Sequence, residues 1–187
     1  MIKSLEAHQR IALDTETDSL DPYKAKLVGI SVAWSELNAV YIPLGHSYLG
    51  CPKQLSYDQV LPAIQRLFSD PSKTWVGHNL KFDLAVLKKY GFNQPAQFRD
   101  TMIMGHLLYP EAQLVLKSLA SKILGEERKG LKDILGKEGN FRQLDLKTAC
   151  QYAAADAENT WSLFSVFETE LETKPGLKNL AEKILLV

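Results

Sequence analysis

Arg10-Ile-Ala-Leu-Asp-Thr-Glu16 is the stretch from which the fold can be inferred. Its middle residues alternate as the two faces of a strand require, so Asp14 and Glu16 are predicted to project from one face. A strand apolar enough for the interior of a sheet does not carry two carboxylates on one face unless something offsets their loss of hydration. A pair of divalent cations is the usual compensation. This strand is therefore predicted to border a metal site.

Two predicted helices carry further candidate residues. Residues 79–91 read as a helix with Asn79 as its N-cap and Asp83 in its first turns. A longer helix is predicted from about residue 145 past residue 167, because alanines and aromatic residues recur there at intervals of three and four. Tyr152 and Asp156 lie four residues apart on that helix and share a face beside its apolar stripe. A tyrosine and a carboxylate so placed indicate a site.

Each of these residues also has an ordinary explanation. Asp14 and Glu16 could end an acidic strand, and Asp83 could stabilise the first turn of its helix. Asp156 could pair with a lysine, and Tyr152 could be a core aromatic residue with its hydroxyl satisfied. All of these explanations must hold together, whereas one shared site accounts for every residue at once. The shared site is the favoured hypothesis.

The acidic motifs resemble those of a known family. Asp14-Thr-Glu16, Asn79-x-x-x-Asp83 and Tyr152-x-x-x-Asp156, in this order, resemble the exonuclease motifs of the DEDD superfamily in its tyrosine-containing branch. The similarity covers roughly residues 10–168 and is strongest to the proofreading domain of bacterial family A DNA polymerases, the DNA polymerase I type. The stretches that carry it are Ala12–Leu20, Leu27–Ser31, Val76–Asp83, Asp100–Met102 and Tyr152–Asp156.

The resemblance implies a metal-dependent 3′-5′ exonuclease of DNA replication and repair. It implies two divalent metal ions, Mg²⁺ or Mn²⁺. Asp14 would bridge both ions, and Glu16 and Asp156 would complete the shell of the ion that activates water. Asp83 would hold the second ion, directly or through water, and Tyr152 would position the attacking water. The product would be nucleoside 5′-monophosphates released from single-stranded or frayed DNA ends.

The resemblance also implies a set of substrate contacts. Thr17, Leu20, Asn79 and Phe82 match family positions that line the pocket of the terminal nucleotide. Leu131 falls where the polymerase relatives can carry an aromatic residue that packs on the terminal base. Stacking on an aromatic residue is worth about 1–3 kcal/mol per base, so an aliphatic residue here weakens the grip on substrate.

The order of predicted elements indicates an α/β fold with a mixed five-stranded sheet flanked by helices. Strands at residues 26–34 and 39–44 form an antiparallel meander with the first strand. Residues 74–77 and a short strand before residue 100 each lead into a helix. Asp58 and Asp100 are the predicted caps of two of the helices. The resemblance adds that this is a ribonuclease H-like fold.

Length and composition agree with one enzyme domain spanning residues 1–187. A chain of 187 residues with 45% hydrophobic content can bury one substantial core and has no room for a polymerase body. We expect either a stand-alone exonuclease or a fragment of a longer polymerase. A polymerase body, in the same or another chain, is an expected partner.

The charge balance bears on nucleic-acid binding. With 22 basic and 22 acidic residues the chain is neutral, so tight non-specific duplex binding is not expected. The segment from residue 117 to residue 147 is locally basic and could track a single strand, although a solvated lysine-rich surface is the favoured interpretation for most of it. Its basic residues are Lys117, Lys122, Arg128, Lys129, Lys132, Lys137, Arg142 and Lys147.

Two alternatives to the DNA exonuclease stay open. The same site could act on RNA, as in a ribonuclease D-like enzyme, or the domain could be a weakly active strand-binding or scaffold domain. Two cysteines form neither a thiolate metal motif nor a disulfide framework. No apolar leader or membrane-length stretch occurs, so a soluble, cytoplasmic protein without membrane contact is expected.

Overall fold

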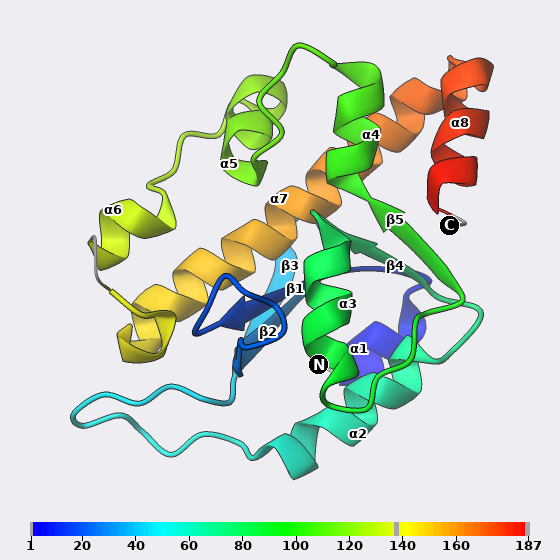
Figure 1. Ribbon diagram of the computed structural model, residues 1–187. Helices are drawn as coiled ribbons and strands as arrows, with labels where there is room; N and C mark the ends of the chain where they lie inside the picture. Colours follow the sequence, from blue (N-terminus) through cyan, green and yellow to red (C-terminus); the bar gives the residue numbers. More distant parts are fainter. Residues whose placement is uncertain (1, 137–138, 186–187) are drawn as a thin grey trace.

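The computed structural model describes residues 2–136 and 139–185, which leaves Lys137 of the basic segment outside the described residues. Its sheet has five strands in the order β3-β2-β1-β4-β5 (Figure 1). β1 pairs antiparallel with β2, and β2 pairs antiparallel with β3, whereas β1-β4 and β4-β5 are parallel. The strands are β1 Arg10–Thr17, β2 Leu27–Ser35, β3 Asn38–Pro43, β4 Thr74–Gly77 and β5 Gln97–Asp100. The predicted mixed sheet with three antiparallel strands first is confirmed.

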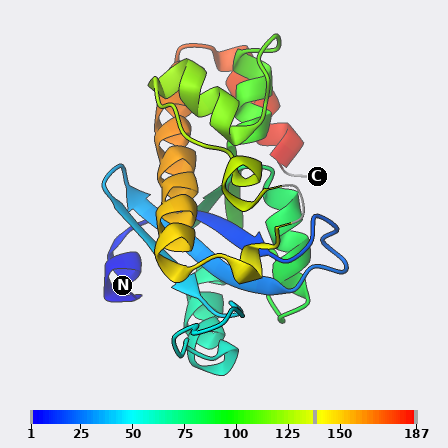
Figure 2. The same cartoon turned by 90° about the vertical axis from the view of Figure 1, so that its left-hand side faces the viewer.

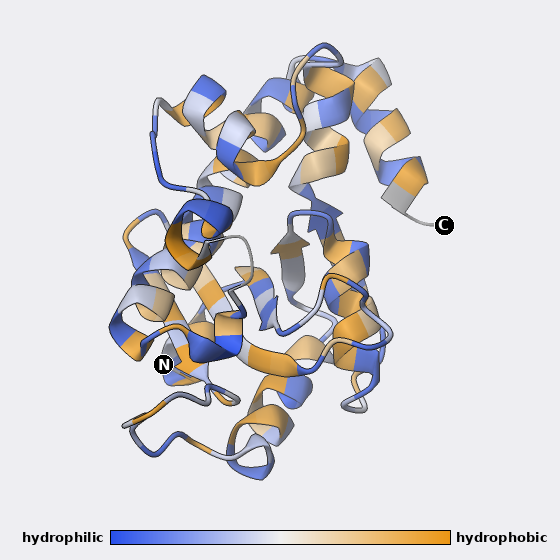
Figure 3. Cartoon of the chain, turned by 60° about the vertical axis from the view of Figure 1, so that its left-hand side comes forward, coloured by the Kyte–Doolittle hydropathy of each residue, from blue (hydrophilic) through white to orange (hydrophobic). Residues whose placement is uncertain are grey.

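Helices cover both faces of this sheet (Figures 1 and 2). The longest of them, α7, crosses one face and packs against β1, β2 and β3. Figure 3 shows apolar and polar residues alternating along the helices, as packing on a sheet requires. The helices are α1 Ile2–Ala7, α2 Tyr57–Phe68, α3 Leu80–Lys88, α4 Thr101–Leu108, α5 Leu116–Leu119, the π-helix η1 Ala120–Leu124, α6 Leu131–Leu135, the 3₁₀ helix η2 Phe141–Gln143, α7 Leu146–Glu172 and α8 Pro175–Leu185.

The two faces of β1 belong to different cores. Ile11 and Leu13 are fully buried in the core formed with α1, α2 and α3. Ala12 faces the other way and is buried in the core formed with α4 and α7. Because side chains alternate along a strand, Asp14 and Glu16 follow Ala12 onto the α7 side. The predicted shared face of the two carboxylates is thus the one that α7 covers.

Small residues let α7 lie close to the sheet. Ala12 of β1 is paired with Ala33 of β2, and both are fully buried. Ala149, Ala153 and Ala157 repeat every fourth residue on the buried side of α7. The spacing between packed elements depends on the side chains at the contact, so these alanines bring the helix backbone near the strands. Residues that flank the alanines on α7 are thereby brought to the edge of β1.

Two of the predicted helix caps differ from the observed ones. α2 begins two residues earlier than expected, after Ser56, whose backbone N–H donates to Gln59 Oε1 at 2.9 Å. Asp58 lies in the first turn and is not the cap. Pro62 is therefore the sixth residue of the helix, where its missing N–H does remove a helical hydrogen bond.

Asp100 caps two helices at once. As predicted, its carboxylate accepts from the backbone N–H of Met102 at 2.9 Å and caps α4. It also accepts from the backbone N–H groups of Asn79 and Leu80 at 3.1 and 2.8 Å. Asn79 does precede α3, but it has left-handed backbone angles (φ 59°, ψ 43°), and its side chain makes no capping bond. The predicted side-chain capping by Asn79 is wrong, and the buried carboxylate of Asp100 replaces it.

No helix among the described residues has the combination of length and apolar composition that crossing a membrane requires.

Removing the Asp100 carboxylate should weaken the fold more than removing an ordinary cap. Asp100→Ala leaves three backbone N–H groups without an acceptor, so the free energy of unfolding should fall by about 2–4 kcal/mol. Asp145→Ala removes the single cap of α7 at Thr148 and should cost about 1 kcal/mol. Urea unfolding followed by circular dichroism measures both. Equal losses for the two variants would contradict the double-cap role.

Candidate active site

All ten residues predicted to form the site line one cavity of about 600 Å³. It opens beside the carboxyl-terminal ends of β1 and β4, where the chain passes from strand to loop or helix. The acidic and tyrosine candidates in its lining are Asp14, Glu16, Asp83, Tyr152 and Asp156, and the substrate candidates are Thr17, Leu20, Asn79, Phe82 and Leu131. Segments more than a hundred residues apart in sequence therefore meet at one place.

Three elements supply the carboxylates. β1 contributes Asp14 and Glu16, and α7 contributes Asp156 one turn after Tyr152. Asp83 comes from α3, which packs on the opposite face of the sheet. The strand residue between the two β1 acids holds it, because Asp83 Oδ1 accepts from the backbone N–H of Thr15 at 2.9 Å and from its hydroxyl at 2.6 Å. Thr15 thus connects the two sides of the site.

Burial and mutual repulsion disfavour the charged state of these acids. Glu16 is 7% exposed and Asp83 is 3% exposed. Desolvation raises the pKa of Asp14 and of Glu16 well above their ordinary values, and the neighbouring carboxylates raise these pKa values further. Desolvation also raises the pKa of Asp83 to about 7, against the hydrogen bonds from Thr15 that lower it. The four acids lie within each other's electrostatic field.

The two α7 residues interact with this group. Burial raises the pKa of Asp156 to about 6, while the neighbouring Tyr152 hydroxyl and then Arg128 act in the opposite direction. Burial, followed by the charge of Asp156, raises the pKa of the Tyr152 hydroxyl. Tyr152 therefore keeps its proton at neutral pH and can donate a hydrogen bond. Its ring contacts Phe141 edge-on at 6.1 Å between ring centroids.

The donor set suits hard divalent cations. Oxygen ligands from several carboxylates are what Mg²⁺ and Mn²⁺ prefer, and positive charge would relieve the repulsion among these acids. Glu16 Oε1 is buried and has no hydrogen-bond partner among the described residues. Among the described residues, no group of three His, Cys, Asp or Glu side chains is already arranged to hold a metal ion. Asp83 has one oxygen directed at Thr15, so its other oxygen is the one that can reach an ion.

The predicted substrate residues form the rim of the same cavity. Leu20 is 90% exposed at its mouth, in the loop that follows β1. Phe82 lies on α3, Leu131 begins α6, and the Thr17 hydroxyl donates to the Ser19 carbonyl at 2.8 Å. The side-chain oxygen of Asn79 is buried and has no hydrogen-bond partner among the described residues.

The cavity also contains residues that the motifs did not indicate. Apart from Thr15, these are His78, Met102 and the segment Leu114–Leu116. His78 Nδ1 lies 2.9 Å from the Thr101 hydroxyl, and its Nε2 lies 2.8 Å from the Leu114 carbonyl. His78 therefore holds the 114–116 segment against the cavity. His78 directly precedes a motif residue, but no sequence pattern indicates its distant partner at residue 114.

A family model described as 3′-5′ exonuclease matches residues 1–172. The chain belongs to this exonuclease family. DNA polymerase I of Pseudomonas aeruginosa is 39% identical over 98% of this chain, an alignment that covers 21% of the polymerase. The exonuclease chain thus spans about a fifth of the length of this curated relative. The resemblance to the DNA polymerase I proofreading domain is confirmed.

Solved structures show the same fold. Brucella melitensis NrnC bound to pGG is 25% identical, with a TM-score of 0.74, and the match covers 95% of this chain and 80% of that one. Escherichia coli RNase D is 21% identical with a TM-score of 0.74, over 99% of this chain and 45% of that one. The exonuclease chain therefore has the ribonuclease H-like fold that these nucleases share.

Neutralising one central acid should stabilise the metal-free protein. In chelator at pH 8, Asp14→Asn should raise the free energy of unfolding by about 1–2 kcal/mol, because it removes a charge that the folded state disfavours. Folding raises the pKa of Asp83 to about 7 and that of Asp156 to about 6, so the stability linked to protonation of these two acids is full below about pH 4 and is lost as the pH rises through about 6–7.

The gain from Asp14→Asn should shrink when unfolding is measured at pH 5, because the raised pKa of Asp14 destabilises the folded state less as the pH falls. Asp58→Asn, at an exposed position in the first turn of α2, is the matched control and should lower stability by at most about 1 kcal/mol and not raise it at either pH. A loss of stability in Asp14→Asn at pH 8 would show that the acids do not repel one another.

Proposed function

We propose that this chain hydrolyses the 3′-terminal phosphodiester bond of single-stranded or frayed DNA and releases nucleoside 5′-monophosphates, as a proofreading-type exonuclease. The observation that carries this proposal is the convergence of four carboxylates and Tyr152 on one cavity. The DNA polymerase I relatives support DNA as substrate. The expected metal requirement is two divalent ions, Mg²⁺ or Mn²⁺.

The carboxylates of β1 and α7 would together hold one ion, and a carboxylate of β1 and one of α3 would hold the other. In this assignment Asp14 contributes to both ions, Glu16 and Asp156 to the first, and Asp83 to the second. Bound divalent ions supply a water of lowered pKa and neutralise charge on the leaving 3′ oxygen. The protein's own part is to keep four acids at fixed positions despite their repulsion, which the Thr15–Asp83 hydrogen bonds do for one of them.

Tyr152 would orient the attacking water. Its hydroxyl keeps its proton because burial and Asp156 raise its pKa, so it donates to the oxygen of the water without having to act as a base. The Glu16 carboxylate would accept from the same water. The aromatic contact with Phe141 limits where the Tyr152 ring can lie.

The rim residues would receive the terminal nucleotide. Leu20 and Leu131 offer apolar surface to the base, and the buried oxygen of Asn79 offers a hydrogen-bond acceptor to sugar or base. Leu131 is only part-buried and aliphatic, so it packs on a base without the stacking of an aromatic ring. We expect a weaker grip on the terminal nucleotide than in relatives with an aromatic residue there.

RNA is the second candidate substrate, because Escherichia coli RNase D, an exoribonuclease, has the same fold.

The matches also differ in how much of each relative they cover. The match to NrnC bound to pGG covers 80% of that chain, whereas the match to DNA polymerase I covers about a fifth of the polymerase. A small stand-alone nuclease is therefore one model for this chain, and a domain that receives frayed ends from a polymerase body is the other. The two models share the same catalytic residues and differ in the substrate that reaches them.

Asp156→Asn should abolish hydrolysis of a 5′-labelled single-stranded DNA, with kcat lowered at least about a thousandfold, because one ligand charge is lost. Wild type should yield a ladder shortening from the 3′ end with Mg²⁺ or Mn²⁺ and none with chelator. Asp58→Asn should match wild type. A folded Asp156→Asn protein with full activity would overturn the site assignment, and an inactive wild type would favour a binding or scaffold role.

A DNA and an RNA oligonucleotide of one sequence should differ in kcat/KM by about tenfold or more in favour of DNA, since a polymerase-type pocket is fitted to the deoxyribose of its terminal nucleotide. Both substrates are compared at equal concentration with one enzyme preparation and the same metal. A preference for RNA would reassign the chain to the ribonuclease class and leave the catalytic residues unchanged.

A further inference from the structure

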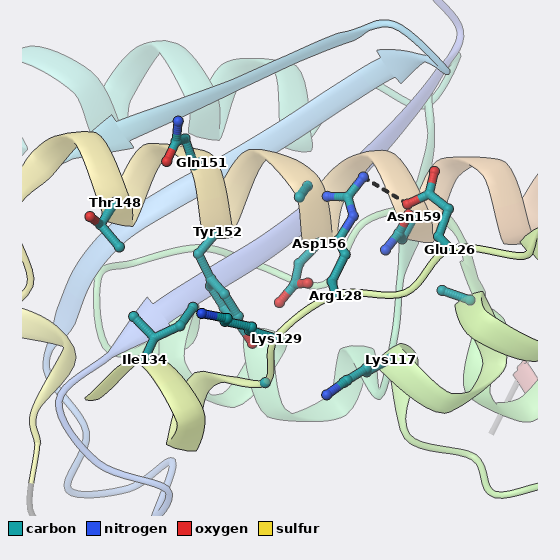
Figure 4. Close-up of a pocket in the computed structure, with 13 residues that line it drawn as sticks. Lys117, Glu126, Arg128, Lys129, Ile134, Thr148, Gln151, Tyr152, Asp156 and Asn159 are labelled. Carbon is teal, nitrogen blue, oxygen red and sulfur yellow. Dashed lines mark ion pairs between the residues drawn. The ribbon is translucent and has the colours of Figure 1, made fainter. Parts of the chain in front are cut away.

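A second, smaller cavity lies next to the catalytic one, on the exposed side of α7 (Figure 4). Its volume is about 190 Å³, and it shares Tyr152 and Asp156 with the catalytic cavity. Its walls are α7, the loop of residues 125–130, Ile134 near the end of α6, and residues of α5 and η1. Tyr152 and Asp156 therefore border both spaces.

Three cations line this cavity, although the chain as a whole is neutral. Lys117 comes from α5, and Arg128 and Lys129 come from the 125–130 loop (Figure 4). The other polar side chains of the lining are Thr148, Gln151 and Asn159 on α7, and two carboxylates, Glu126 and Asp156, line the cavity as well. Arg128 is close enough to Asp156 to lower the pKa of that carboxyl. Three cations against two carboxylates give the lining a net positive charge directly beside the acidic site.

The carboxylates that pair with these cations hold them weakly. Arg128 lies 2.7 Å from Glu126, with both side chains more than a third exposed. Lys117 lies 3.7 Å from Asp133, and both are about half exposed. Ion pairs at such exposure contribute about 0–1 kcal/mol, so an incoming phosphate can displace the carboxylate partners at little cost. A phosphate also offers Arg128 a two-pronged hydrogen bond.

We propose that this cavity binds the backbone phosphate on the 5′ side of the bond being cleaved, through Arg128, Lys129 and Lys117. The inference rests on the proposed function, since it places the terminal nucleotide in the catalytic cavity and the scissile phosphate at the carboxylates. The strand would then continue in the 5′ direction past Tyr152, which borders both cavities.

Charge favours a phosphate over a nucleobase, because the cations of the lining attract an anion and a base is neutral. The four acids repel a polyanionic strand, so cations beside them supply the attraction that the neutral chain otherwise lacks. The cavity would therefore determine how firmly a strand of three or more nucleotides is held.

The first test is equilibrium binding in chelator, which does not depend on catalysis. Fluorescence anisotropy of a labelled (dT)8 is measured against wild type, Arg128→Gln/Lys129→Gln and the charge-matched control Lys122→Gln/Lys147→Gln. The first variant should bind about tenfold more weakly, and its slope of log affinity against log salt should fall by about 0.7–1.4, because each lost phosphate contact on a single strand contributes about 0.7. The control should keep the wild-type slope.

The second test uses the number of phosphates in the substrate. The dinucleotide dTpdT has only the scissile phosphate, whereas (dT)8 without a 5′-phosphate has six more on its 5′ side. The ratio of kcat/KM for (dT)8 to that for dTpdT should fall about tenfold in Arg128→Gln/Lys129→Gln. If Arg128 acted only through Asp156, both substrates would lose activity equally and the ratio would stay constant.

The outcomes separate this inference from the proposed function. Unchanged (dT)8 affinity and salt slope in a folded Arg128→Gln/Lys129→Gln protein would overturn the phosphate site, whether or not the enzyme is active. Equal weakening in the control variant would do the same, since it would indicate general attraction to a basic surface. Weaker binding in the first variant alone would support the site even if no hydrolysis were seen.

Discussion

The repulsion among four carboxylates, two of them buried and two part-buried, is the constraint on which the rest of this structure depends. Each acid has its charged state disfavoured by desolvation, and the acids of β1 are disfavoured further by their neighbours. A fold that holds such a group must take its stability from elsewhere. Here the two apolar cores on either face of the sheet provide it, and β1 contributes to both of them.

The geometry of the site follows from how closely α7 lies to the sheet. Ala149, Ala153 and Ala157 set that distance, and Tyr152 and Asp156 lie between them along the same helix. Larger residues in the alanine row would move both functional side chains away from β1. Packing in the core and chemistry at the edge are therefore controlled by the same stretch of sequence, and the acid from α3 is secured separately through Thr15.

Periodicity in the sequence predicts the strands and the main helices, and the shared chemistry of the motifs together with the family resemblance predicts that they converge. Alternation placed Asp14 and Glu16 on one face, and a spacing of four placed Tyr152 with Asp156. The wrong predictions concern helix caps, that is, which side chain accepts hydrogen bonds from the backbone N–H groups at the start of a helix. Asp100 lies 21 residues from Asn79, so its cap on α3 is a tertiary contact that local preferences cannot reveal. The roles of His78 and of the 125–130 loop could not be predicted for the same reason, because both depend on contacts between segments that only folding brings together.

The double cap at Asp100 has a mechanical consequence. Because one buried carboxylate bonds the first residues of α3 and α4 together, these helices can shift only as a unit. They carry Phe82 and Met102 into the catalytic cavity, so that wall has a fixed spacing. His78 ties the 114–116 segment to the same unit, because it bonds both the Thr101 hydroxyl and the Leu114 carbonyl. Leu131, on the five-residue helix α6, lies outside these bonds, so adaptation to nucleotides of different size would fall to the α6 side of the cavity.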